Sequence, residues 1–191
     1  MTPTDALRQA FAAAPRRGFL PDRQRRYADL DQALQIGHGQ TNSQPRTVWA
    51  MLSLLDVLPG QRILDVGCGS AWTTALLGHL VGPEGSVIGV EIVPELVAFG
   101  RANLVTQQLP NVHVVPAEPG VLGLPEEGPF DRILVSAEAT RLPRALVEQL
   151  RRGGVMVVPV AGWMREVRRT AKGEPDVVRH GAYSFVPLLG G

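Results

Sequence analysis

The sequence is short of cysteine, and this shortage limits both its fold and its compartment. Its 191 residues include one cysteine, Cys68, so the chain cannot contain an internal disulfide. None of the four histidines lies close in sequence to Cys68 or at metal-ligand spacing from another histidine. We therefore expect no structural metal site and a reducing compartment, the cytoplasm.

Long apolar runs, aromatic residues and net charge are also scarce. No run approaches the roughly 20 apolar residues of a membrane span, and the first residues lack the apolar core of a secretory signal. The formal net charge is +1 and aromatic residues make up 5% of the chain. Five arginines crowd residues 16–26, but Phe19 is the single aromatic residue among them, so the segment lacks the repeated aromatic residues that stack on bases. We expect neither a membrane nor a nucleic acid as a partner.

Hydrophobic residues are abundant, at 45%, so we expect one domain with a sizeable core. Strand and helix patterns alternate along the chain, which predicts a mostly parallel sheet with helices on both faces. Strands are predicted at 62–67, 86–91, 112–115, 130–136 and 155–160, and helices at 4–14, 45–56, 71–80, 94–107 and 143–150. Two further strands, in 165–170 and 183–189, flank the polar turn 171–176 and predict an antiparallel edge. Residues 31–44 show little helical period and predict a loop.

The junction between the first strand and its helix has the pattern of a ligand-binding loop. Residues 65–71 read DVGCGSA, and glycines there let backbone N–H groups approach a ligand at a helix N-terminus. Glu91 ends the next strand, where a carboxylate can accept hydrogen bonds from both hydroxyls of a ribose. Asp65 stands two residues before the G-x-G, and a third glycine is absent. This suits a ligand with a cationic amino group better than a pyrophosphate, which favours S-adenosylmethionine.

Two acidic residues and one thiol near this loop have a structural interpretation as an alternative to a role in ligand binding or catalysis. Asp65 has an alternative as a turn or cap residue. Glu118 follows the third strand and can accept from an adenine amino group, or it is an exposed loop acid. A small free thiol beside a glycine loop is usually a packing residue, so we do not expect Cys68 to be reactive.

A second motif is more specific than the glycine loop. The segment 36–45, IGHGQTNSQP, closely resembles the substrate-loop signature of the protein-L-isoaspartate O-methyltransferases. Other blocks similar to this family follow its order: AFAAAPRRGFLP, ILDVGCGS, VEIVPEL, GPFDRILVSA, LPRALVEQLRRGG and FVPLLGG. The resemblance implies an α/β fold with a single Rossmann-like methyltransferase domain over residues 1–191. Within it, 1–58 form an N-terminal helical cap and substrate loop, 59–160 the cofactor-binding core, and 161–191 the C-terminal strands.

The resemblance also implies an activity and a set of site residues. The activity is transfer of a methyl group from S-adenosylmethionine to the free carboxylate of L-isoaspartyl residues in damaged proteins or peptides, leaving S-adenosylhomocysteine. Ser43 takes the place of the serine that the family associates with catalysis, and its alternative is a plain helix N-cap before Pro45. Cofactor contacts are implied at Thr41, Asp65, Gly67, Cys68, Gly69, Ser70, Glu91, Ile92 and Glu118.

The chain departs from the family pattern mostly on the acceptor side. Asn42 stands where an apolar residue is expected, and Arg46 where an aromatic one is. Other departures are at residues 71–72, 117–119, 138–141 and 161–164. Glu138 is expected to oppose an anionic acceptor unless Arg46 or Arg141 neutralises it. Two alternatives therefore stay open: a methyltransferase of the same fold with another peptide or small-molecule acceptor, and a non-catalytic S-adenosylmethionine-binding protein.

Overall fold

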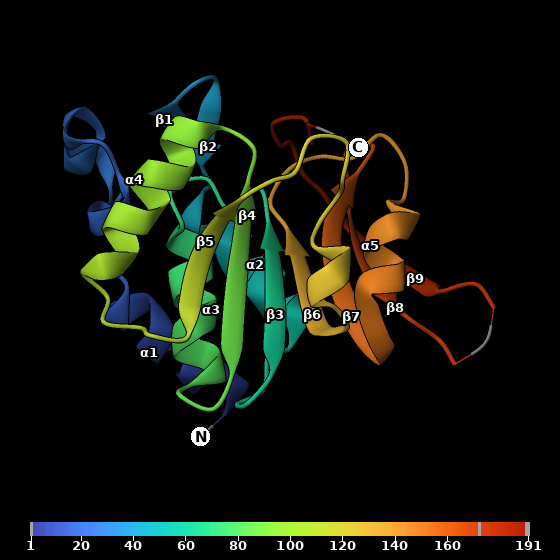
Figure 1. Ribbon diagram of the computed structural model, residues 1–191. Helices are drawn as coiled ribbons and strands as arrows, with labels where there is room; N and C mark the ends of the chain where they lie inside the picture. Colours follow the sequence, from blue (N-terminus) through green and yellow to red (C-terminus); the bar gives the residue numbers. More distant parts are fainter. Residues whose placement is uncertain (1, 172, 190–191) are drawn as a thin grey trace.

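The computed structural model describes residues 2–171 and 173–189 and is built around a seven-stranded sheet (Figure 1). Its strands lie in the order β5-β4-β3-β6-β7-β8-β9. The pairs from β5 to β7 are parallel, and β8 and β9 add in antiparallel fashion. The predicted α/β class, with a mostly parallel sheet and an antiparallel edge, is confirmed. Lys172 of the predicted turn and the last two residues of the FVPLLGG block lie outside the described residues.

The five parallel strands are the branched apolar runs of the sequence. They are β3 (Arg62–Val66), β4 (Ser86–Glu91), β5 (Val112–Pro116), β6 (Phe130–Val135) and β7 (Leu150–Val160). The central strands β3 and β6 are buried along nearly their whole length, because both faces of the sheet are covered there. Since parallel strands point the same way, the loops that follow β3, β4, β5 and β6 meet at one edge of the sheet.

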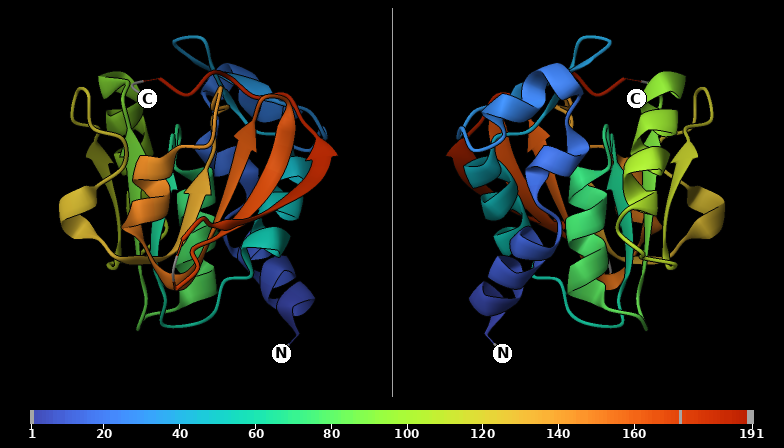
Figure 2. Two further views of the ribbon diagram at one scale, coloured as in Figure 1. Left: turned by 90° about the vertical axis from the view of Figure 1, so that its right-hand side faces the viewer. Right: turned by 90° about the vertical axis from the view of Figure 1, so that its left-hand side faces the viewer.

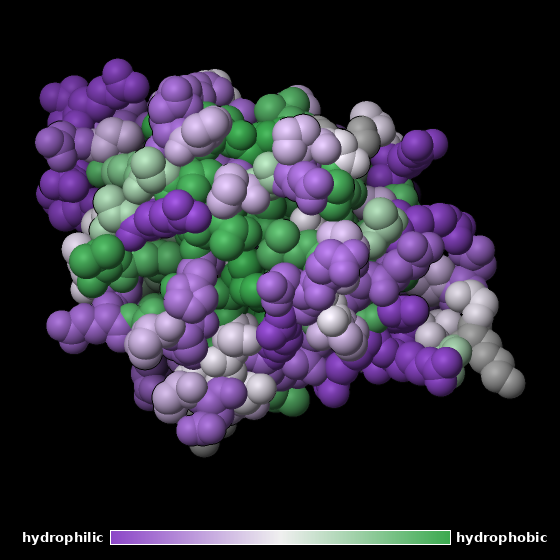
Figure 3. All heavy atoms as spheres, viewed as in Figure 1, coloured by the Kyte–Doolittle hydropathy of each residue, from purple (hydrophilic) through white to green (hydrophobic). Residues whose placement is uncertain are grey.

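Helices cover both faces of the sheet, but unequally (Figure 2). The larger core is shared by the helices α1 (Pro3–Ala13), α2 (Pro45–Leu55), α3 (Trp72–Val81) and α4 (Pro94–Val105). On the other face α5 (Arg144–Gln149) contributes Leu146 and Val147 to a second core, beside the short 3₁₀ turn η3 (Pro125–Glu127). Figure 3 shows apolar side chains gathered over β4 and β5 on the side of the molecule that carries α5.

The predicted loop at 31–44 is partly wrong, because it contains a short antiparallel hairpin. Its strands are β1 (Leu34–Gly37) and β2 (Gln40–Asn42). Leu34 and Ile36 are buried against Leu96 of α4 and the segment that holds the 3₁₀ turns η1 (Arg16–Phe19) and η2 (Asp22–Tyr27). A strand of four residues has room for only two buried positions, so its period of two gave too little signal.

The last predicted strand, at 183–189, is wrong. The closing hairpin is formed by β8 (Trp163–Arg168) and β9 (Asp176–Ala182). Six of the seven side chains of β9 are exposed, so this edge strand lacks the apolar pattern that would have revealed it. Pro187 offers no N–H for a sheet ladder, and residues 183–189 instead run past the end of β6. There Glu138 donates its N–H to the Val186 carbonyl, and Leu188 donates to the Glu138 carbonyl, each at 2.8 Å.

Candidate active site

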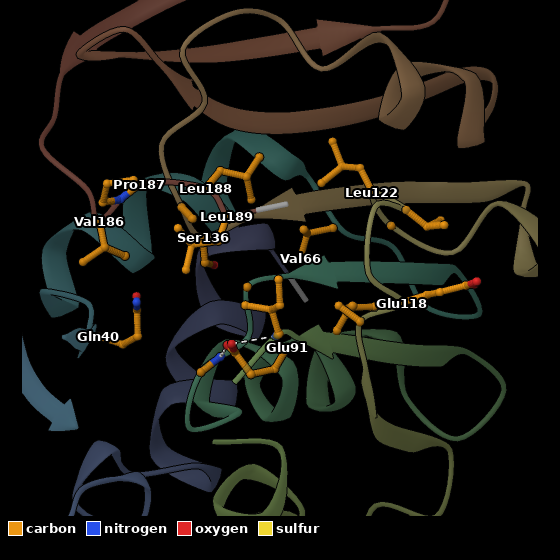
Figure 4. A pocket seen from close by; sticks show the side chains of 18 of the residues that line it. Gln40, Val66, Glu91, Glu118, Leu122, Ser136, Val186, Pro187, Leu188 and Leu189 are labelled. Atoms are coloured by element: carbon orange, nitrogen blue, oxygen red, sulfur yellow. Dashed lines mark hydrogen bonds between the residues drawn. The ribbon is translucent and has the colours of Figure 1, made fainter. Parts of the chain in front are cut away.

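A pocket of about 690 Å³, open to solvent, lies at the carboxyl ends of β3, β4 and β6 (Figure 4). Parallel α/β sheets bind ligands at this edge. The pocket is lined by residues of the hairpin, the strand ends, the loop after β5 and the C-terminal segment. Its lining residues are Gln40, Thr41, Val66, Gly67, Gly69, Val90, Glu91, Ile92, Ala117, Glu118, Val121, Leu122, Gly123, Ser136, Ala137, Val186, Pro187, Leu188 and Leu189.

Glu91 supplies a fixed carboxylate to the pocket wall. Its Oε2 accepts from the N–H of Gly69 at 2.8 Å, and its Oε1 accepts from Ile92 at 2.8 Å and Val93 at 3.0 Å (Figure 4). The side chain is 5% exposed, so these charge-assisted hydrogen bonds determine where the carboxylate lies. A carboxylate has about four acceptor positions, of which three are used, so one is left for a hydroxyl of a bound ribose.

The loop between β3 and α3 brings bare backbone to the pocket. Gly67 and Gly69 both line it, with φ of 73° and 53°, a left-handed conformation that glycine adopts without strain. A Cβ on Gly67 would stand 3.6 Å from the Cβ of Ala137, which also lines the pocket. The glycine therefore keeps open a space that a side chain would occupy.

Asp65 lies beneath this loop, at the end of β3. Its Oδ2 accepts from the hydroxyls of Thr73 at 2.7 Å and Thr74 at 2.8 Å, and Ser136 Oγ lies 3.5 Å from its Oδ1. Burial raises the pKa of Asp65 to about 6, against the lowering effect of these hydroxyls, and Glu91 adds to the rise. A nearby cation would reverse the shift, so the site suits a ligand that carries positive charge.

Cys68 and Ser70, like Asp65, do not line the pocket. Cys68 is buried, and a Cβ on Gly89 of β4 would lie 2.9 Å from its Sγ, so the thiol packs against β4. Burial raises the pKa of this thiol, which keeps it protonated and unreactive. Ser70 is 2% exposed, and its Oγ accepts from Asn42 Nδ2 at 3.1 Å.

The structure thus divides the implied cofactor residues into two sets. Six line the pocket: Thr41, Gly67, Gly69, Glu91, Ile92 and Glu118. Three support its loop from beneath: Asp65, Cys68 and Ser70. Glu118 is exposed where it lines the pocket, near Leu122 (Figure 4).

Ser43 lies just beyond the pocket lining, after Thr41 and Asn42. It is half-buried, and within residues 2–171 and 173–189 its hydroxyl makes no hydrogen bond. The N-cap of α2 is Gln44, whose side chain does not cap the helix, so the interpretation of Ser43 as an N-cap is wrong. The hydroxyl is available to a group that enters beside Thr41.

Comparison with known proteins decides the family. The family model of protein-L-isoaspartate(D-aspartate) O-methyltransferase (PCMT) matches residues 1–191. The chain belongs to the PCMT family. As a PCMT protein it is an S-adenosylmethionine-dependent methyltransferase, which confirms the resemblance and the cofactor that the loop pattern favoured.

Individual PCMT relatives cover nearly the whole chain. The protein-L-isoaspartate O-methyltransferase of Pyrococcus horikoshii is 39% identical over 192 residues, which span 98% of this chain and 86% of that one. The enzyme of Methanopyrus kandleri is 42% identical over 193 residues, spanning 98% and 84%. A solved structure of a putative enzyme of this name from Plasmodium falciparum, in complex with S-adenosyl-L-homocysteine, superposes with a TM-score of 0.84. It is 25% identical and covers 98% of this chain and 91% of its own.

The PCMT pocket has an apolar wall that the sequence analysis did not assign. Val121, Leu122 and Gly123, in the loop after β5, follow no periodic pattern that would have pointed to them. Val186 to Leu189 belong to the FVPLLGG block, so the resemblance contained a signal for them. Their role was missed because the segment was interpreted as a strand.

Glu138 does not present an open carboxylate to the acceptor side of this PCMT protein. Its Oε1 accepts from the N–H of Gly162 at 2.8 Å, and its Oε2 lies 3.5 Å from the N–H of Phe185. Arg46 pairs with Asp31 instead, at 2.7 Å. Main-chain donors, rather than an arginine, therefore engage the Glu138 carboxylate.

The described residues hold neither a metal-binding cluster nor a membrane-spanning helix. No group of three or more histidine, cysteine, aspartate or glutamate residues within 2–171 and 173–189 could hold a metal ion. In the same part of the chain, no helix is both long enough and apolar enough to cross a membrane.

Proposed function

We propose that this PCMT protein methylates the free carboxylate of L-isoaspartyl residues in damaged proteins and peptides. The observation that carries the proposal is the position of Ser43. Its hydroxyl, which makes no hydrogen bond in the described part of the chain, follows by two residues the Thr41 that lines the same pocket as Glu91. A hydrogen-bond donor thus stands beside a site built for a nucleoside.

The pocket residues fit S-adenosylmethionine in chemistry. Glu91 would accept from the ribose, and Ile92, Val121 and Leu122 would contact the adenine. Asp65, with its raised pKa, gains from a ligand that brings a cationic amino group and sulfonium. When bound, the cofactor supplies an electrophilic methyl group.

The acceptor needs positioning rather than activation. An isoaspartyl carboxylate is ionised at pH 7, so it is already a nucleophile and no general base is required. Ser43 would donate one hydrogen bond to it, worth about 1.5–3 kcal/mol for a charged acceptor. Thr41 and the segment Val186 to Leu189 line the pocket and would restrict water near the reacting atoms.

We also propose the setting of this activity. Its partners are isoaspartyl proteins and peptides, and its compartment is the cytoplasm. The support for this compartment is Cys68, the single cysteine, which is free and buried. We assign no role to a nucleic acid or a membrane.

The proposal is tested by transfer of labelled methyl from S-adenosylmethionine to an isoaspartyl peptide, measured as base-labile ester. The normal aspartyl isomer of the same peptide is the control. We expect label on the isoaspartyl form alone. A protein that binds S-adenosylhomocysteine yet labels neither peptide contradicts the proposal. Transfer to another acceptor would then favour a methyltransferase of altered specificity, and no transfer at all would favour a binding protein.

A further inference from the structure

Asn42 occupies an inward-facing position next to Ser43. It ends β2, and successive side chains of a strand point to opposite sides. Thr41 lines the pocket, whereas Asn42 is 5% exposed and points into the protein. A buried amide requires partners for both its oxygen and its nitrogen.

Asn42 finds these partners in two separate segments. Its Nδ2 donates to the Oγ of Ser70 at 3.1 Å. Ser70 belongs to the loop between β3 and α3, residues 67–71, which we call the cofactor loop. Its Oδ1 accepts from the Nε of Arg16, in η1, at 2.7 Å. Ser70 is fixed in turn, because its carbonyl accepts from Asn103 of α4 at 3.0 Å. One short side chain therefore connects the hairpin to the loop that carries Gly69.

Arg16 holds the main chain on both sides of this contact. Its Nη2 donates to the carbonyl of Asn42 at 3.0 Å and to that of Ser43 at 2.9 Å, and the residue is 6% exposed. Burial lowers the pKa of Arg16 to about 10, so the guanidinium stays charged at neutral pH. The backbone of Ser43 is thus held by Arg16, and its neighbour is bonded to the cofactor loop.

We propose that Asn42 is a positioning residue, which fixes the Ser43 hydroxyl relative to the cofactor loop through its hydrogen bond to Ser70. The inference rests on the proposed function and adds a role for a residue that touches neither substrate nor cofactor. An amide suits this position because it accepts from Arg16 and donates to Ser70 at once. An aspartate would keep the first contact and would keep the second only if the Ser70 hydroxyl turned to donate, whereas a leucine would lose both.

The experiment compares Asn42→Asp and Asn42→Leu with the wild type. We expect kcat to fall about tenfold in Asn42→Leu and by less in Asn42→Asp, because a small misplacement of a positioned group is costly in turnover. The KM for the peptide and the Kd for S-adenosylhomocysteine are expected to stay within about twofold of the wild type. Asn42→Asp is expected to keep its Tm, since Arg16 retains an acceptor there.

Asn111 provides a matched control amide. It lies at the other end of β5, where its Nδ2 donates to the carbonyls of Gly82 at 2.8 Å and Gly85 at 2.7 Å. Asn111→Leu removes a comparable pair of hydrogen bonds away from the pocket. It is expected to lower Tm without changing kcat at temperatures where the protein is folded.

Two results would overturn the inference. One is wild-type kcat in Asn42→Leu, which would make the Ser70 contact irrelevant to turnover. The other is a Kd for S-adenosylhomocysteine that rises in proportion to the loss of kcat, which would place Asn42 in cofactor binding.

Hydrogen exchange separates this inference from the proposed function. Saturating S-adenosylhomocysteine is expected to slow exchange of amides 40–43 in the wild type, and not in Asn42→Leu. Equal slowing in both proteins would refute the coupling. Slower exchange in the wild type and not in the variant, together with no methylation of an isoaspartyl peptide by the wild type, would refute the proposed function alone.

Discussion

At the scale of single residues, the site separates cofactor binding from acceptor positioning. Glu91 is fixed by three backbone donors within the pocket wall, so its carboxylate is pre-oriented before a ligand arrives. Ser43 is outside that wall, and its hydroxyl makes no hydrogen bond within residues 2–171 and 173–189. We therefore propose that the two side chains act on different molecules.

This separation predicts opposite kinetic signatures. Ser43→Ala removes a hydrogen bond to the acceptor carboxylate, and we expect kcat/KM to fall about 10- to 150-fold, the equivalent of about 1.5–3 kcal/mol. The Kd for S-adenosylhomocysteine, measured by titration calorimetry, is expected to stay unchanged. Glu91→Ala is the matched variant, in which that Kd rises first. Equal loss of affinity and turnover in Ser43→Ala would instead give the serine a structural role.

The sequence was informative about site residues whose backbone and position determine their role. Gly67, Gly69 and Glu91 could be predicted because strand, glycine loop and next strand end have a fixed spatial relation in this fold. Cys68 and Ser70 share the same loop but turn inward, and a motif does not tell which side a residue faces. Asn42 acquires its partner Ser70 only in the folded chain, 28 positions away.

At the scale of elements, two segments without regular helix or strand complete the pocket: the loop after β5 and the C-terminal segment. Residues 183–189 form one wall, and Glu138 fixes them through two backbone hydrogen bonds and a carboxylate that faces the N–H of Phe185. The same carboxylate accepts from Gly162, at the turn between β7 and β8. Glu138 therefore joins the sheet edge to the pocket wall.

Replacement of this carboxylate tests the connection. Glu138→Ala leaves a half-buried N–H of Gly162 without its acceptor, and we expect a loss of about 1–2 kcal/mol in the free energy of unfolding. We also expect several-fold weaker binding of S-adenosylhomocysteine, because residues 183–189 lose an anchor. Urea unfolding and calorimetry measure the two effects. Glu138→Gln retains an acceptor oxygen and serves as the control. If Glu138→Ala binds as tightly as the wild type, the wall does not depend on this contact.

Elements were predictable where burial was continuous. The five parallel strands and α1 to α4 have strong apolar patterns, and their predicted ranges agree with the observed ones to within a few residues. The hairpin β1–β2 is too short for a pattern, and β9 is an exposed edge. Tertiary pairing, rather than local preference, produces these elements.

At the scale of the whole molecule, the buried charge under the pocket couples folding to pH. Asp65 has a pKa of about 6 in the folded protein, against 3.8 as its ordinary value. The folded state therefore keeps this proton at a pH where the unfolded state has lost it. The stability that the proton contributes is complete below about pH 4 and disappears as the pH rises through 6.

Asp65→Asn isolates this contribution. We expect the free energy of unfolding of the wild type to fall, relative to that of the variant, as the pH rises. The change between pH 4 and pH 7 is up to about 3 kcal/mol. Urea denaturation without cofactor at several pH values measures it. Asp31→Asn is a control, since hydrogen bonds from Arg46 lower the pKa of Asp31 and give the opposite slope. A difference that does not vary with pH would show that the pKa of Asp65 is not raised.

The buried Arg16 has a consequence for the approach of a substrate. Its side-chain hydrogen bonds all end on carbonyl or amide oxygens, and in the described part of the chain no carboxylate lies within 4.0 Å of it. Within the described residues no carboxylate pairs directly with this guanidinium behind the Ser43 carbonyl, although Asp31 acts on it electrostatically from farther away. Little water screens it there. An anionic acceptor that approaches this serine enters an attractive electrostatic potential that the fold maintains permanently, before any side chain has to move.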